Sequence, residues 1–318
     1  MSFGLILKRV YKQGMSNMKK VVLMGGCVLV MASMLQAADA VIKVTPEWTA
    51  EIRKLAPAKP TVKPKAKRRL LVFTLMTGYK HWVTTNTTVM VKVLGDKSGA
   101  FDVVVSDDVH MFDADKLSEF DAVLLNNTCS KRDHRDLFLD ALGEGKKDEV
   151  AALEKNLMEY VRGGKGLVLI HGGIVSFNNV PEIADMIGGR FDFHLPQQEM
   201  VLVPVDANHK LVKAFEGKQF VHVDEPYMFK GAYAGKNFRP LLEVDVSKLK
   251  CGSRKQKVES DKRYAAWIKR YGKGRVFFSS PSHNARSFSQ PQLLQFYLDG
   301  IQYALGDLEC DDTPLKRK

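Results

Sequence analysis

The sequence predicts an α/β protein in which a doubly wound, mostly parallel sheet carries an antiparallel extension. Between residues 70 and 187, short apolar runs alternate with amphipathic segments, which is the order of strands and helices in parallel sheets. The runs 70–75 and 166–170 are almost entirely apolar, as strands covered on both faces tend to be. Beyond residue 187 the expected strands follow one another with few helices between them, which favours antiparallel pairing.

The elements follow from apolar periodicity and from the residues that end each segment. The parallel half comprises expected strands at 70–75, 101–105, 122–125 and 166–170, and helices at 84–94, 148–161 and 181–187. Glycine pairs at 163–164 and 188–189 stop the helices at 148–161 and 181–187, as is common at helix C-termini. The antiparallel strands are expected at 200–205, 241–246, 264–268 and 276–279, before a final helix at 291–305 that begins with Pro291.

The first 69 residues are expected to lie outside this domain. Residues 1–40 resemble a secretory signal peptide, because Lys19 and Lys20 precede an apolar run at 21–35 and then alanines at 37, 38 and 40. Cleavage after Ala40 fits, as does cleavage two or three residues earlier, and the alternative is an uncleaved anchor, for which the run is short. We therefore expect export to a periplasmic or extracellular location, with no membrane span after cleavage.

The remaining segments are a Pro- and Lys-rich linker, one domain and a tail. Residues 41–69 are expected to form the extended linker, within which 48–55 could form a short helix with little packed against it; residues 70–308 are expected to form the domain and residues 309–318 the tail. The chain of 318 residues has a net charge of +12, but 13 basic and 3 acidic residues lie within 1–68. The remaining residues, 69–318, contain 35 basic and 33 acidic residues, so their net charge is only +2. This near-neutral charge argues against nucleic-acid binding by the folded part.

Two histidines are expected directly after strands of the parallel half. His81 follows the first strand, and His171 follows the strand at 166–170 and precedes two glycines, which is the pattern of a strand-to-turn elbow. Imidazole titrates near neutral pH, so both are candidates for proton transfer or metal ligation. The alternatives are a surface or helix-entry residue for His81 and a residue that only fills the turn for His171. In class I glutamine amidotransferases the comparable elbow carries a nucleophilic cysteine. A histidine stands here instead, which argues against glutaminase activity.

Further candidates come from the loops around residues 127, 194, 225 and 283. In Asp224-Glu225-Pro226-Tyr227, adjacent side chains point to opposite sides, so we expect Glu225 to face the cleft and Asp224 to face backbone amides or a basic partner. The alternative is a simple turn with Glu225 in solvent. His283 is a further candidate for catalysis. The candidates for substrate binding are Asn127, Asp224, Tyr227, His194 and Trp82. Cys129 also follows a strand, and we interpret it as an inert, partly buried thiol rather than a nucleophile.

Several separated blocks together resemble the ThuA-like (trehalose utilisation) family. They are residues 78–81, 160–166 leading to His171, 187–191 leading to His194, 224–227, and 267–283. The resemblance covers roughly residues 70–305 and implies a flavodoxin-like fold related to class I glutamine amidotransferases. It also implies a link to carbohydrate use, including trehalose and oxidised keto-sugars, and aligns His81, His171, Glu225 and His283 with recurrent polar positions of the family. Two positions depart from the family pattern: Ser282 stands where Gly is common, and Lys210 where Pro follows the histidine.

Together these observations predict an exported enzyme that acts on a sugar or keto-sugar derivative. A histidine or Glu225 would remove a proton, and another histidine would protonate the leaving oxygen. Three histidines and one carboxylate also suit a divalent metal ion, although their spacing forms no sequence motif for one. The alternative is a noncatalytic carbohydrate-binding module, in which the same groups bind sugar hydroxyls. Convergence of His81, His171, Glu225 and His283 favours the enzyme, and their dispersal favours the module.

Overall fold

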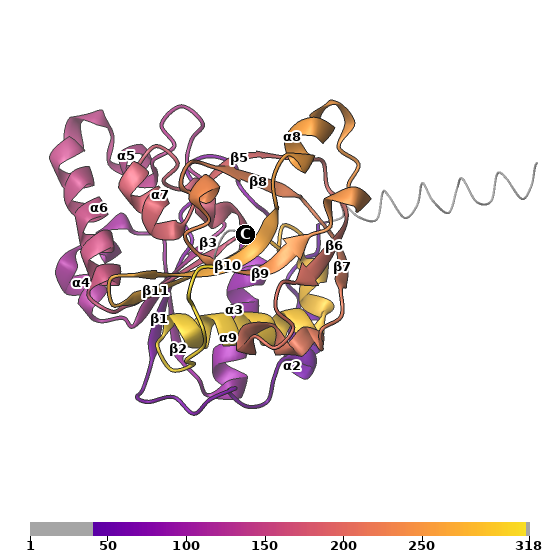
Figure 1. Cartoon of the computed structure of the whole chain (residues 1–318). Coiled ribbons are helices and arrows are strands. Elements are labelled where there is room, and N and C mark those ends of the chain that lie inside the picture. Colours follow the sequence, from indigo (N-terminus) through magenta and orange to yellow (C-terminus); the bar gives the residue numbers. More distant parts are fainter. Residues whose placement is uncertain (1–40, 316–318) are drawn as a thin grey trace, which may run out of the picture. The chain divides into compact units, whose positions relative to one another are not determined.

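The computed structural model describes residues 41–315 of the chain. The predicted signal peptide at 1–40 lies outside these residues. A nine-stranded sheet with the order β2-β1-β3-β4-β11-β10-β9-β6-β7 organises the described part (Figure 1). Its first five strands are parallel, and their spatial order is that of a flavodoxin-like fold, with β11 as the fifth strand. The structure thus confirms the predicted α/β class, the mostly parallel sheet and the antiparallel extension.

The parallel strands are short, and all except the edge strand β2 are mainly buried. They are β1 (Arg69–Phe73), β2 (Asp102–Ser106), β3 (Ala122–Asn126), β4 (Gly166–Ile170) and β11 (Gly274–Ser279). The helices that connect or flank them are α3 (Thr84–Ser98), α4 (Ala114–Ser118), α5 (Leu137–Leu142), α6 (Lys147–Arg162), α7 (Pro181–Ile187) and α9 (Pro291–Ala304). The predicted boundaries of these strands and of the long helices agree with the structure to within a few residues.

The antiparallel extension continues the sheet from β11. It consists of β10 (Tyr264–Tyr271), β9 (Arg239–Val244), β6 (Gln198–Pro204) and β7 (Phe220–Asp224), with the short helix α8 (Lys255–Glu259) before β10. A separate two-stranded sheet pairs β5 (Arg190–His194) with β8 (Tyr227–Lys230), and it places His194 opposite Tyr227. The strands β5, β7 and β8 were not predicted from the sequence, because they are only four or five residues long and polar residues interrupt the apolar pattern of β5 and β7.

Successive strand residues face two different hydrophobic cores. In β1, Val72 packs in the core that contains α3 and α9, whereas Leu71 packs in the core that contains α6 and α7. Figure 1 shows these helix pairs on opposite faces of the sheet. Because side chains alternate along a strand, a strand between two helix layers is apolar at every position, which explains the uninterrupted apolar runs.

The segment before β1 differs from the extended linker that we expected. Residues 46–55 form α2 (Pro46–Leu55), which Thr45 caps through its hydroxyl, and Ile52 is buried in the core beside α3. Farther along, the Thr61 amide donates to the Gln302 side chain of α9 over 2.9 Å. The prediction of a tether is therefore wrong for residues 46–68. Trp48 and Ile52, four residues apart, supply the apolar stripe that packs this helix.

The expected C-terminal tail also packs against the domain over part of its length. Cys310 contacts the core, and the Asp312 carboxylate accepts a hydrogen bond from the Tyr303 hydroxyl over 3.0 Å. Within residues 41–315, no helix combines the length and the apolar character that a membrane crossing requires.

Candidate functional site

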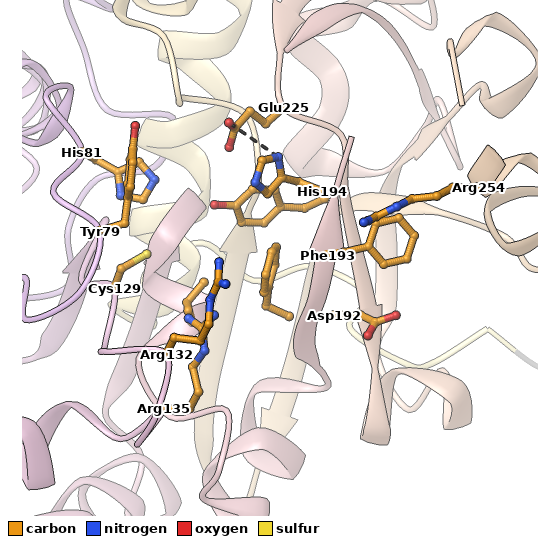
Figure 2. Close-up of a pocket in the computed structure, with 13 residues that line it drawn as sticks. Tyr79, His81, Cys129, Arg132, Arg135, Asp192, Phe193, His194, Glu225 and Arg254 are labelled. Atoms are coloured by element: carbon orange, nitrogen blue, oxygen red, sulfur yellow. Dashed lines mark ion pairs between the residues drawn. The ribbon is translucent and has the colours of Figure 1, made fainter. Parts of the chain in front are cut away.

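Four neighbouring strand ends converge on one edge of the sheet. β1, β3, β4 and β11 are parallel, so the loops that follow their carboxyl ends emerge together, and ligands of open α/β sheets bind at this edge. A cavity of about 560 Å³ lies here (Figure 2), and its lining includes His81, Glu225 and Tyr227. Its volume is in the range of small-molecule sites.

His171 occupies the elbow that the sequence predicted. It directly follows β4 and has a φ of 45°, a left-handed conformation that non-glycine residues adopt rarely. A Cβ atom at Gly172 would lie 2.7 Å from the His81 ring, and one at Gly173 would lie 2.4 Å from the Leu125 carbonyl oxygen. Only glycines therefore allow this turn to pack so closely against the neighbouring loops.

A backbone contact fixes the tautomer of His171. Its Nδ1 lies 2.8 Å from the Ser280 carbonyl oxygen, which can only accept, so Nδ1 carries the proton in the neutral ring. The Nε2 lone pair then faces the Nδ1 of His283 over 3.1 Å. Such an orienting contact behind a ring is typical of ligating and proton-transferring histidines.

Asp224 positions the loop that carries His283. Ser282 has a φ of 123°, and the buried Asp224 carboxylate accepts hydrogen bonds from the Ser282 amide over 2.6 Å and from the His283 amide over 3.2 Å. This conformation favours glycine, so it gives a physical reason for the glycine that the family resemblance leads us to expect in place of Ser282. The serine does not displace His283, because Asp224 holds both amides.

Glu225 points to the other side, as expected from the alternation along an extended segment. Its Oε2 lies 3.6 Å from Nε2 of His171 and 3.4 Å from Nδ1 of His283, while its Oε1 lies 3.6 Å from Nδ1 of His194. Figure 2 shows the last of these contacts. One carboxylate therefore joins three histidines that come from β4, from β11 and from the small sheet.

His81 completes the group from the loop after β1. Its ring lies edge-on to those of His171 and His283, with centroids 5.1 and 5.3 Å away. The side chain is buried, and its Nδ1 has no hydrogen-bond partner among the described residues. A buried nitrogen without a partner is costly, so an unpaired imidazole that also lines a cavity favours a ligand-binding or proton-transferring role.

Burial and mutual repulsion keep His81 and His283 neutral. Burial, followed by the charges of His171 and His283, lowers the pKa of His81 to about 2, and burial and His171 likewise lower the pKa of His283. Burial alone would raise the pKa of Glu225, but the hydrogen bond to His171 and the charges of His283 and the other histidines hold it below its ordinary value. At neutral pH unprotonated His81 and His283 therefore lie beside an ionised Glu225.

The donor set fits a divalent metal ion. The ligand atoms of His81, His171 and His283 all lie within 4.8 Å of one another. The distances that join the His171, His283 and Glu225 ligand atoms are 3.1, 3.4 and 3.6 Å. Four tetrahedral ligands at about 2.0–2.1 Å from one ion stand about 3.3–3.4 Å apart, so this triangle has the size of one tetrahedral face. Neutral imidazoles and an ionised carboxylate are also the forms that bind zinc.

Some of the predicted catalytic and substrate-binding residues line the cavity, and others do not. His194 and Tyr227 line the cavity, as do His81 and Glu225 of the predicted catalytic set. His171 and His283 lie behind Glu225 rather than in the lining, and His171 is fully buried.

Three predicted substrate-binding residues do not line the cavity. Asn127 is buried and accepts a long hydrogen bond of 3.4 Å from the Gly172 amide, so it supports the elbow. Asp224 holds the loop of His283, and Trp82 packs against the core beside α3. These contacts give the three residues structural roles, and direct substrate contact stays a prediction for them. Polar or aromatic residues beside a strand end can equally serve the loop itself, and their residue type does not distinguish the two roles.

Cys129 lines the cavity but is not an activated nucleophile. Burial raises the pKa of its thiol to about 12, and the Sγ lies 3.7 Å from the Gly172 carbonyl oxygen. A thiolate is the reactive form, so this group stays inert at neutral pH. The structure agrees with the interpretation of Cys129 as a buried, inert thiol.

Most residues of the outer wall of the cavity were not predicted from the sequence. The missed residues are Arg132, Arg135, Val175, Phe191, Asp192, Phe193 and Arg254. The arginines lie on loops, where charged residues are ordinarily expected to be exposed to solvent. Nothing in the sequence therefore indicated that they line a cavity. Phe191 and Phe193 alternate with Asp192, and this period of two was the one available sign of a strand at the cavity.

Fold and site together define a flavodoxin-like α/β protein with a histidine-rich cluster at the carboxyl edge of its sheet. The family model of ThuA, described as trehalose utilisation, matches residues 69–304, and the chain therefore belongs to the ThuA family. No curated protein matches the chain.

Two solved structures show the same fold. One, from Bacteroides uniformis, is described as a ThuA-like protein. It is 16% identical with a TM-score of 0.58, and the match covers 77% of this chain and 94% of that one. Another ThuA-like protein, from Parabacteroides merdae, is 20% identical with a TM-score of 0.54, and that match covers 76% of this chain and 90% of that one. At these identities the likeness establishes the fold alone.

Proposed function

We propose that this ThuA-family protein is an enzyme that acts on a sugar or keto-sugar derivative by acid–base chemistry. The observation that carries the proposal is the convergence of His81, His171, His283 and Glu225 at a cavity large enough for a small saccharide. A noncatalytic module needs hydrogen-bond donors and acceptors at its surface. It does not need largely buried imidazoles such as His81 and His283, whose pKa values are lowered, and such groups cluster at catalytic sites.

Each side chain has a task that its environment favours. Glu225 is ionised and lines the cavity, so it can accept a proton from a substrate hydroxyl or from carbon beside a carbonyl. His81 is unprotonated, with a free Nδ1 lone pair, and its lowered pKa suits it to accept a hydrogen bond or to ligate a metal ion rather than to hold a proton. His283 and His171 share a short contact behind Glu225, through which a proton taken up at the carboxylate can be delocalised and returned.

A divalent metal ion would be held by His81, His171, His283 and Glu225. When bound, it would supply a Lewis acid that polarises a substrate carbonyl or hydroxyl oxygen. The exposed ring of Tyr79, which packs edge-on against His81 at a centroid distance of 4.7 Å, offers an apolar face on which a sugar ring can stack.

The experiment is a substrate screen with the purified protein. Disaccharides and 3-keto-glycosides are incubated with wild type and Glu225→Gln, each with and without a chelator, and products are identified by mass spectrometry. His110→Gln is the matched control, because His110 is half exposed on another loop. Turnover that Glu225→Gln abolishes and His110→Gln retains supports the proposal. Sugar binding without any turnover favours the carbohydrate-binding module instead.

We also propose that the protein is exported. The support is the order of charged, apolar and small residues at 19–40, which is that of a secretory signal peptide. Cell fractionation followed by N-terminal sequencing tests this. A periplasmic or extracellular protein that begins near residue 38 or 41 agrees with the proposal, and a cytoplasmic protein that retains residues 19–40 contradicts it.

A further inference from the structure

We propose that Arg132 and Arg135 form a subsite for an anionic group on the substrate, which makes the substrate an acidic sugar derivative rather than a neutral one. The proposal rests on the proposed function only for the choice of a sugar as the remainder of the ligand. Carboxylate, sulfate and phosphate esters share the oxyanion chemistry that guanidinium groups recognise.

The two arginines lie where two cavities meet. Both line the main cavity of about 560 Å³ and an adjoining cavity of about 290 Å³, which Arg190 and Lys230 also line. In Figure 2 their side chains rise from the loop after Cys129 toward the middle of the main cavity. A ligand that contacts His81 and Glu225 with one end can therefore reach the arginines with the other.

Neither guanidinium has a protein partner that would satisfy it. Among residues 41–315, the side chains of Arg132 and Arg135 form no ion pair and no hydrogen bond. The two carboxylates that line the same cavities are already engaged. Asp192 contacts Lys257 over 2.6 Å and Lys230 over 3.5 Å, and Glu225 contacts the histidines. Positive charge at the cavity mouth is thus left uncompensated, although the chain from residue 69 onward is nearly neutral.

The backbone that carries the arginines is held in place while their side chains stay free. The Arg135 amide donates to the Lys131 carbonyl over 2.8 Å, and its carbonyl accepts from the Asn179 amide over 3.0 Å. The Lys131 amide donates to the Asp140 carboxylate over 2.6 Å, and the Ser130 hydroxyl donates to the Val175 carbonyl over 2.9 Å. Because the loop is pre-ordered, binding an anion orders only the two side chains.

A third arginine extends the positive wall on the opposite side of the cavity. The Arg254 guanidinium stacks over the Phe193 ring, 4.4 Å from its centroid, and both residues line the cavity. Stacking leaves the edge of a guanidinium available for hydrogen bonds. We assign the specific contacts to Arg132 and Arg135, and Arg254 contributes general attraction for a negative ligand.

Calorimetric titration of the purified protein tests the proposal. The probes are methyl glucoside, methyl glucuronide, glucose 6-sulfate and glucose 6-phosphate, in wild type and in Arg132→Gln/Arg135→Gln. We expect at least one charged probe to bind about tenfold or more tightly than methyl glucoside, with an affinity that falls as salt rises. The ranking of the three charged probes identifies the oxyanion.

The double variant is expected to lose this preference and to keep its affinity for methyl glucoside. Lys131→Gln is the matched control, because Lys131 is exposed on the same loop but lines neither cavity, and it should bind like wild type. Arg132→Gln alone, in which only an exposed side chain changes, gives a partial loss and guards against misfolding of the double variant. Equal affinities for charged and neutral probes, or an unchanged preference in both variants, would overturn the proposal.

Glu225→Gln separates the subsite from the proposed function. This variant should retain the arginine-dependent preference, because Glu225 contacts histidines and not the arginines. If wild type shows the preference but turns over no sugar, the anion subsite stands and the catalytic function fails. If wild type turns over neutral sugars and shows no preference, the function stands and the subsite fails.

Discussion

Replacement of Asp224 tests how the site is held together. The carboxylate is fully buried and accepts hydrogen bonds from the amides of Ser282, His283 and Glu225 over 2.6, 3.2 and 2.8 Å. Asp224→Ala leaves these donors without an acceptor, and each buried donor without a partner costs about 1–3 kcal/mol. Part of this cost is offset because the variant no longer buries a carboxylate. We therefore expect the free energy of unfolding to fall by about 3 kcal/mol, and by about half as much in Asp224→Asn, which keeps one acceptor oxygen.

Urea unfolding followed by fluorescence measures this change, with the buried Trp267 as one reporter. Asp96→Ala is the matched control, because Asp96 forms an exposed ion pair with Arg53 and such pairs contribute little. It should lose less than about 1 kcal/mol. If Asp224→Ala is no less stable than Asp96→Ala, Asp224 does not hold the loop of His283, and our explanation of the tolerated Ser282 is wrong.

The other predictions concern His81, Ser282 and Ile52. Because the pKa of His81 is about 2 in the folded state and about 6.5 when unfolded, the unfolded chain binds more protons between these values. Stability without metal should thus fall below pH 6.5 by about 1.4 kcal/mol per pH unit from this residue, and urea titrations of His81→Gln in chelator should show a shallower slope. Ser282→Gly should raise the unfolding free energy by up to about 1 kcal/mol, because relief of the strained φ exceeds the lost hydroxyl contact with Tyr297; a loss refutes this. Ile52→Ala should lower the unfolding free energy by about 2–4 kcal/mol, whereas an extended tether would show no change.

The sequence predicted the parallel half of the fold because its signals are local. Strands such as β4 are buried on both faces, so their apolar runs are uninterrupted, and glycines end the neighbouring helices. The strands β5, β7 and β8 escaped detection because they are short, and β5 and β8 pair only with each other across the intervening strands β6 and β7. The packing of α2 was missed because the segments that α2 contacts, α3 and the turn at 285–289, lie far from it in the sequence.

The candidate site was predictable to the extent that it follows strand ends. His81, His171 and His283 each follow a strand, and parallel topology alone brings such positions together. Glu225 was chosen over Asp224 from side-chain alternation, and the structure places the two carboxylates accordingly. The arginines at the cavity mouth could not be predicted, because their role depends on which carboxylates lie nearby, and only the folded chain determines that.

The central claim is that the histidines and Glu225 act as one catalytic unit. The measurement is kcat/KM for a substrate found in the screen, in Glu225→Gln, in His283→Gln and in the double variant. Residues that act as a unit are not additive, so we expect each single change to lower kcat/KM by about 10²–10⁴ and the double change to lower it no further than the worse single change. Single variants that retain activity within about tenfold of wild type, or losses that multiply in the double variant, would contradict the claim.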